Sequence, residues 1–252
     1  MKFSATDWSF YGKCKSPETY YNDLKSLGYD GVEMVDQSRW QAARKAGLEI
    51  INLSGPGMEQ GLNQTSLHKE LIPAITDCIA MAGENNIPQV IVFSGNRNGQ
   101  DDDTGINNCC IALEKLLPIA EKSNVILTFE MLNSYNHVDY QADSGKYGFK
   151  LAEKLNHPSF KLIYDIFHME RMGCNAAAEI AEHVGVIGHI HLAESPDRGI
   201  PLANGNIKYC NIVPKVIKAG YTGYWGMEFM PAKESLAELE AARNTFLAIT
   251  AG

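Results

Sequence analysis

The sequence predicts an α/β protein whose parallel strands alternate with helices and close into a (β/α)8 TIM barrel. Three observations lead to this prediction. The chain has 252 residues, close to the usual size of one such barrel. Eight short apolar segments alternate with segments of helical spacing, which is typical of a parallel sheet. No G-x-G-x-x-G follows the first apolar segment, which counts against the open dinucleotide-binding sheet.

The expected strands are short apolar runs separated by helical patterns. They cover residues 2–6, 31–35, 48–53, 89–93, 125–130, 160–165, 187–191 and 224–228. Eight such units favour closure into a barrel over an open sheet.

Capping residues predict where the helices begin and end. Ser16 and Pro17 are suited to the cap and the first helical position after the first strand. The tripeptide Lys-Ala-Gly precedes a strand at residues 45–47 and again at 218–220, where its glycine ends a helix. Because no linker or low-complexity segment interrupts this pattern, residues 1–252 are expected to form one domain. Further helices are expected over residues 39–46, 67–84 and 234–249, and in the segment that ends near residue 122.

The composition excludes several classes of protein. Hydrophobic residues make up 45% of the chain, enough for a packed core. The formal net charge of −8 argues against a nucleic-acid partner, which needs a basic surface. The first residues contain no long apolar stretch, so neither a signal peptide nor a membrane partner is expected. The six cysteines form no C-x-x-C pair and indicate free thiols in a reducing, cytoplasmic compartment.

Four consecutive expected strands end with a residue of a type that commonly binds metals: Glu130, Asp165, His191 and Glu228. The carboxyl ends of all strands in a parallel barrel share one rim, so the four side chains are expected to meet there. A single acidic residue at a strand end is more often a helix cap, but four on consecutive strands favour a divalent-metal site. Three carboxylates and one imidazole suit Mn²⁺ or Mg²⁺. The imidazole also keeps Co²⁺, Fe²⁺ and Zn²⁺ as alternative ions.

Neighbouring residues receive weaker predictions. We expect His189 and His191 to point to opposite sides of their strand, with His191 facing the barrel mouth. His189 would then pack outside the barrel or form a hydrogen bond within the core. Trp8 follows the first strand and could form a wall of the substrate pocket, or pack over the mouth. For Glu33, in the second strand, we expect a supporting or core hydrogen bond.

Four sequence segments surround the candidate ligands. They read Phe-Glu-Met-Leu-Asn-Ser at 129–134, Tyr-Asp-Ile-Phe-His-Met at 164–169, Gly-His-Ile-His-Leu-Ala-Glu-Ser-Pro-Asp-Arg at 188–198 and Met-Glu-Phe at 227–229. Together they resemble the xylose-isomerase-like TIM barrels, and within these the hydroxypyruvate isomerase branch. The tagatose-3-epimerase-like sugar epimerases are near neighbours. The resemblance spans nearly the whole chain and is strongest over residues 125–231.

The resemblance implies a metal-dependent isomerase of a small hydroxy-carbonyl or sugar substrate. Glu130, Asp165, His191 and Glu228 would bind one divalent ion, and Glu130 and Glu228 would transfer protons on opposite faces of an enediolate. His168 would contact a substrate oxygen, and Arg198 a carboxylate or hydroxyl group. Barrels of this family often associate, so a homo-oligomer is open.

Two residues depart from the family patterns. The epimerase-like members carry glutamate where this chain has Asn136, and hydroxypyruvate isomerases often carry glutamine in place of His191. A keto-sugar epimerase and an inosose-type dehydratase therefore stay as alternatives. An abasic-site endonuclease of the same fold would need three zinc ions and a basic groove, which seven histidines and the −8 charge disfavour. A non-catalytic sugar-binding protein would be expected to have lost one or more metal ligands. All four are retained here, which disfavours this alternative.

Overall fold

The computed structural model describes residues 1–12, 16–232 and 235–251. The fold is an α/β barrel of parallel strands with surrounding helices, as the sequence predicts. The chain divides into two compact units. Residues 1–51, 175–184 and 189–252 form the first unit, and residues 52–174 and 185–188 form the second. That both units make one domain stays a prediction.

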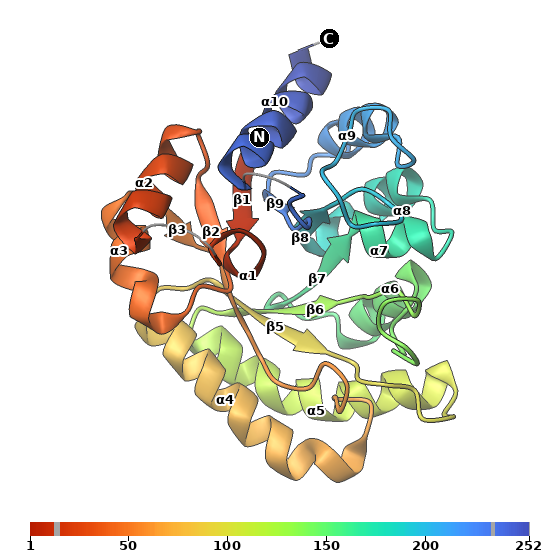
Figure 1. The fold of residues 1–252 in the computed structure, drawn as a ribbon. Helices are drawn as coiled ribbons and strands as arrows, with labels where there is room; N and C mark the ends of the chain where they lie inside the picture. Colours follow the sequence, from red (N-terminus) through yellow and green to blue (C-terminus); the bar gives the residue numbers. More distant parts are fainter. Residues whose placement is uncertain (13–15, 233–234, 252) are drawn as a thin grey trace. The chain divides into compact units, whose positions relative to one another are not determined.

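The first unit contains a run of parallel strands in which β1 pairs with β2 and β9, β2 pairs with β3, and β9 pairs with β8. The helices α2 and α3 lie together beside β2 and β3 (Figure 1). The strands are β1 (Lys2–Thr6), β2 (Gly31–Glu33), β3 (Glu49–Ile50), β8 (Ile187–Leu192, of which the first two residues belong to the second unit) and β9 (Tyr224–Met227). The helices are α1 (Asp7–Phe10), α2 (Pro17–Ser26), η1 (Gln37–Arg39), α3 (Trp40–Lys45), α8 (Ala176–Glu182), α9 (Tyr209–Lys218) and α10 (Ser235–Ala251).

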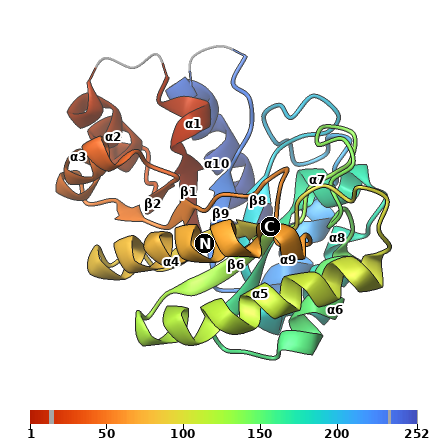
Figure 2. The same cartoon turned by 90° about the horizontal axis from the view of Figure 1, so that it is seen from below.

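The second unit contains four parallel strands in the order β4, β5, β6 and β7. The helices α4, α5 and α6 lie side by side along this unit (Figure 2). The strands are β4 (Asn52–Ser54), β5 (Gln89–Phe93), β6 (Ile126–Glu130) and β7 (Phe160–Asp165). The helices are η2 (Thr65–Leu67), α4 (His68–Glu84), α5 (Asp102–Lys122), α6 (Gly145–Leu155), α7 (Ile166–Arg171) and η3 (Val184–Val186, which begins in the first unit).

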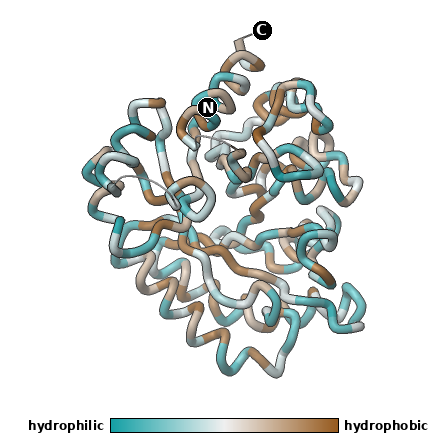
Figure 3. Tube along the Cα trace, viewed as in Figure 1, coloured by the Kyte–Doolittle hydropathy of each residue, from teal (hydrophilic) through white to brown (hydrophobic). Residues whose placement is uncertain are grey.

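Apolar burial on both faces explains the composition of the strands. Every residue of β5 is buried, and the segment is among the most hydrophobic of the chain trace (Figure 3). A continuous apolar run of this kind is typical of a parallel strand that is covered on both sides. In the first unit Phe246 of α10 packs edge-on or tilted against Phe3, Tyr209 and Trp225, all of them buried. These contacts fix β1 and β9, which precede two candidate site residues.

Local sequence signals account for several element boundaries. The Ser16 side chain accepts a hydrogen bond from the Thr19 N–H at 3.2 Å and Pro17 begins α2, as expected. The glycine at 47 has φ +80° and that at 220 has φ +96°, the left-handed conformation that ends a helix. No helix within the described residues has both the length and the apolar character that crossing a membrane requires.

Five of the eight expected strands differ from the prediction at an end. β6 begins one residue later, at Ile126, and β8 ends one residue later, at Leu192. The second strand ends at Glu33 because Met34 has φ +50°, which interrupts the extended run. The expected third strand is divided at Ile51 into β3 and β4. The last strand ends at Met227, so Glu228 follows it directly. Cys14 and the expected helix start at residue 234 lie outside the described residues.

Gly61 is predicted to be required for the packing of the loop after β4. A Cβ atom here would lie 2.4 Å from three backbone atoms of Ser94 and Gly95, which cannot move aside as a side chain can. We expect Gly61→Ala to lower the free energy of unfolding by about 1–3 kcal/mol, the usual cost of overpacking. Urea denaturation would measure this.

Gly185→Ala is the matched control, because a Cβ on Gly185 would have no neighbour within 4 Å. Equal stability of the two variants would contradict the proposed close packing of Gly61.

Candidate functional site

All four predicted ligands are buried at the carboxyl ends of strands. Glu130 ends β6, Asp165 ends β7, His191 is the fifth residue of β8 and Glu228 follows β9. Their exposed fractions lie between 0 and 6%. Glu130 and Asp165 belong to the second unit, and His191 and Glu228 to the first. Buried histidine, aspartate and glutamate clusters in the described part of the chain could hold a metal ion.

The Glu228 carboxylate is held by three side chains of its own unit. Trp8 in α1 donates its indole N–H to Oε1 at 3.0 Å, and Arg198 donates from Nη2 to Oε2 at 2.8 Å. The Nδ1 atom of His191 lies 3.0 Å from the same Oε2. The guanidinium carbon of Arg198 also lies 5.3 Å from the centroid of the Trp8 ring. Three residues that the sequence singles out separately therefore converge on Glu228.

These neighbours determine the charge of Glu228. Burial alone would raise the pKa of its carboxyl group, but the charges of His191 and Arg198 outweigh burial and hold the pKa below its ordinary value. The group is therefore an ionised carboxylate at neutral pH. An ionised, buried oxygen donor is what a hard divalent cation binds.

His189 and His191 contact the same buried carboxylate. The Nε2 atoms of both rings lie 3.0 Å from Oε2 of Glu33, and the ring centroids are 4.8 Å apart. The prediction that the two rings point to opposite sides of the strand is wrong. Side chains two positions apart on a strand lie on the same face, because successive residues alternate. The expected core hydrogen bond of Glu33 is confirmed, including one that Ser4 Oγ donates at 2.6 Å.

In the second unit, Asn133 orients His168. The Asn133 backbone N–H lies 3.0 Å from His168 Nδ1, and its side-chain amide lies 2.6 Å from the same atom. A backbone N–H can only donate, so Nδ1 must accept and the proton of the neutral ring belongs on Nε2. Nε2 lies 3.6 Å from Oδ2 of Asp165. His168 can therefore present a hydrogen-bond donor beside one of the predicted ligands.

Asn133 was not predicted from the sequence as a site residue. Its side-chain oxygen also accepts hydrogen bonds from the backbone N–H groups of Tyr135 and Asn136, at 3.1 and 2.8 Å. This is a turn that asparagine commonly forms with its own following backbone, and an asparagine three residues after a strand is its only sequence signal. Asp165 likewise caps α7 by accepting from the His168 N–H at 3.1 Å.

The distances within the first unit suit a divalent ion. Two neighbouring ligands of an octahedral ion with bonds of about 2.0–2.1 Å lie roughly 3.0 Å apart. The separation of His191 Nδ1 and Glu228 Oε2 is 3.0 Å. A carboxylate and an imidazole at this separation could hold a divalent metal ion.

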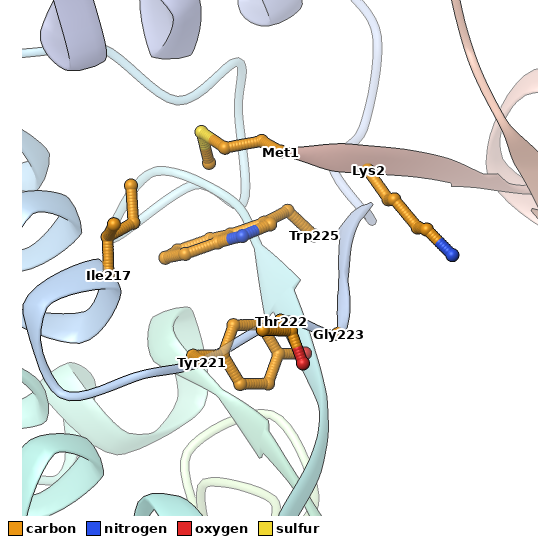
Figure 4. Close-up of a pocket in the computed structure, with 7 residues that line it drawn as sticks. All are labelled: Met1, Lys2, Ile217, Tyr221, Thr222, Gly223 and Trp225. Carbon is orange, nitrogen blue, oxygen red and sulfur yellow. The ribbon is translucent and has the colours of Figure 1, made fainter.

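A cavity of about 310 Å³ lies at the opposite, amino-terminal end of β1 and β9 (Figure 4). Its lining residues are Met1, Lys2, Ile217, Tyr221, Thr222, Gly223 and Trp225. None of them is a predicted site residue. In barrels of this kind the amino-terminal face serves stability, and the chemistry occurs at the carboxyl-terminal face.

A model of the family described as xylose isomerase-like TIM barrel matches residues 21–245, so the chain belongs to this family. The putative hydroxypyruvate isomerase of Homo sapiens is 22% identical over 237 residues, which cover 87% of this chain and 86% of that protein. The hydroxypyruvate isomerase of Escherichia coli K12 is 27% identical, over 47% of this chain and 45% of its own length. The 2-oxo-tetronate isomerase of Haemophilus influenzae is 26% identical, over 69% of this chain and 66% of its own length.

Solved structures share the fold of the whole chain, which confirms the predicted TIM barrel. An AP endonuclease, family 2, from Brucella melitensis has a TM-score of 0.85 at 18% identity, covering 94% of this chain and 96% of that one. The D-psicose 3-epimerase of Clostridium cellulolyticum H10, solved with D-tagatose, has a TM-score of 0.82 at 17% identity and 99% coverage of both chains. The IOLI protein, solved with a zinc atom, has a TM-score of 0.80 at 13% identity, covering 100% and 98%.

The protonation of His168 is a direct test of this geometry. We predict that neutral His168 carries its proton on Nε2, because the Asn133 N–H occupies Nδ1. Two-bond ¹H–¹⁵N correlation spectra of the protein, with His168→Gln used to assign the ring, distinguish the two tautomers. A spectrum with the proton on Nδ1 of the neutral ring would contradict the contact with Asn133.

Proposed function

We propose that this protein is a divalent-metal-dependent isomerase of a small hydroxy-carbonyl compound, similar to hydroxypyruvate isomerase. The family membership and the relatives named hydroxypyruvate isomerase support the reaction class. The observation that carries the proposal is the buried Glu228 carboxylate, which Trp8, Arg198 and His191 hold in place at a strand end. A charged group buried with this many fixed donors is typical of a site that does chemistry.

The four predicted ligands are proposed to bind a single metal ion. Glu130, Asp165, Glu228 and His191 through Nδ1 would bind one ion, Mn²⁺ or Mg²⁺ in the first place. Their positions at the ends of β6, β7, β8 and β9 support this, since the strands of a barrel present their carboxyl ends at one rim. When bound, the ion would hold the substrate's adjacent carbonyl and hydroxyl oxygens and stabilise the negative charge that develops on them.

Glu130 and Glu228 are proposed to transfer the protons. Isomerisation removes a proton from the carbon that bears the hydroxyl group and adds one to the neighbouring carbonyl carbon, while the hydroxyl proton moves to the former carbonyl oxygen. In Glu228, Oε2 already faces His191 and Arg198, so Oε1 is the atom we assign to proton transfer. The Trp8 indole N–H at 3.0 Å fixes the direction of Oε1.

The remaining predicted residues are assigned to substrate binding. His168 would donate from Nε2 to a substrate oxygen, in the orientation that Asn133 imposes. Arg198, which is hydrogen-bonded to Glu228, would also neutralise a substrate carboxylate. The exposed Trp8 ring would form a wall of the substrate pocket. The five described cysteines are free thiols, which supports the cytoplasm as the compartment.

Deuterium exchange tests the function directly. In D₂O with Mn²⁺ or Mg²⁺, we expect the protein to incorporate solvent deuterium into hydroxypyruvate or a short keto sugar, because proton removal beside the carbonyl is reversible. Mass spectrometry detects this even when net conversion is small. EDTA should abolish the exchange, and Glu130→Gln or Glu228→Gln should reduce it by at least about 100-fold, the usual contribution of a catalytic acid or base.

Glu182→Gln is the matched control, because it removes an exposed glutamate at the end of α8. It should exchange at the wild-type rate. Exchange accompanied by loss of water would favour the dehydratase, and inversion at one carbon of a keto sugar would favour the epimerase. No exchange on a panel of hydroxypyruvate, tetruloses, pentuloses, hexuloses and inososes, by protein shown to contain metal, would contradict the isomerase.

A further inference from the structure

We propose that Glu33 is a positioning residue that holds the His191 ring so that Nδ1, and no other atom of the ring, is directed to the metal. The proposal rests on the metal site given above and adds a residue from β2 that acts through His191. The contacts of Glu33 with Ser4, His189 and His191 lie within the first unit, among β1, β2 and β8.

Hydrogen-bond chemistry fixes the direction of the His191 ring. The Nε2 atom of His191 lies 3.0 Å from Oε2 of Glu33, and a carboxylate can only accept. His191 must therefore carry a proton on Nε2. The opposite ring atom, Nδ1, lies 3.0 Å from Oε2 of Glu228 and is the atom that would bind the metal.

Glu33 is itself held on all sides. Ser4 donates to Oε1 at 2.6 Å, and His189 Nε2 lies 3.0 Å from Oε2. The carboxylate and both imidazoles are fully buried. A group held by a hydroxyl and two rings cannot change its orientation without breaking several contacts, so it is a rigid support for His191.

A glycine in β9 leaves room for this arrangement. Gly226 in β9 stands in register with Ser4 of β1 on one side and with His191 of β8 on the other. A Cβ atom on Gly226 would lie 2.3 Å from Glu33 Oε1, 2.7 Å from His189 Nε2 and 2.9 Å from a carbon of the His191 ring. The absent side chain allows Glu33 to reach His191 across β1 and β9.

A partner on the second nitrogen of a metal-binding histidine commonly fixes the tautomer and makes the ring a better ligand. Loss of such a partner typically weakens metal binding about 10- to 100-fold. Glu33 therefore acts on the metal through His191. His189, held by the same carboxylate, is assigned to orient Glu33 and is not a ligand of this ion.

The test measures Mn²⁺ affinity by isothermal titration calorimetry, without any substrate. We expect Glu33→Ala to weaken Mn²⁺ binding about 10- to 100-fold. Glu33→Gln should weaken Mn²⁺ binding less than tenfold. Its amide oxygen can accept hydrogen bonds from both rings while its NH₂ group faces the Ser4 hydroxyl. Tyr209→Phe is the control: it removes a buried hydrogen bond to the Ala193 carbonyl in the same unit and should bind Mn²⁺ as the wild type does.

Two results would overturn the role of Glu33. The first is folded Glu33→Ala with wild-type Mn²⁺ affinity. The second is a second equivalent of Mn²⁺ that disappears in His189→Gln, since Glu33 and the two histidines would then be ligands themselves.

A measurement on the metal-free wild type covers the case in which Glu33→Ala does not fold. ¹H–¹⁵N spectra should show a proton on Nε2 of His191, and its absence would overturn the proposal. If the wild type binds no metal but shows this proton, the proposed function fails while the contact with Glu33 stands.

Discussion

The His191 imidazole lies between two buried carboxylates, with Glu33 on Nε2 and Glu228 on Nδ1. A buried negative charge is costly unless it has a partner. The His191 ring is a partner of both carboxylates. Burial alone would raise the pKa of Glu33, but His189 and His191 hold it well below its ordinary value. A cation bound at Glu228 would add positive charge beside the two buried carboxylates, Glu33 and Glu228.

The register of the strands brings these polar groups together. Ser4, Gly226 and His191 stand in one row across β1, β9 and β8, and Thr6 of β1 is paired with Glu33 of β2. The apolar layer around Phe246 fixes β1 and β9 from outside, so the polar groups on the other side have little freedom. In the second unit Asn133 gives His168 a fixed tautomer in a comparable way. Both histidines are thus oriented by a neighbour that has no direct part in the proposed chemistry.

The sequence predicts the strands and the buried ligands well because both depend on local patterns. The runs that became β5 and β7 agree with the structure at both ends, and all four predicted ligands are buried at strand ends. The opposite-face prediction for His189 is wrong because residues two positions apart on a strand lie on the same face. The hydrogen bond from Trp8 to Glu228 joins residues 220 positions apart, and no local pattern encodes such a contact. The hydrogen bond from Arg198 to Glu228 joins residues 30 positions apart and has no local signal either, and the predicted contact of Arg198 with the substrate stays a prediction.

Glu130, Asp165, His191 and Glu228 are proposed to bind one metal ion. The most direct measurement is the anomalous difference map of crystals grown with Mn²⁺. We predict one peak bonded to the three carboxylates and to Nδ1 of His191. A peak held by Glu33, His189 and His191 in its place, or a manganese-containing crystal with no peak beside His191, would contradict the claim.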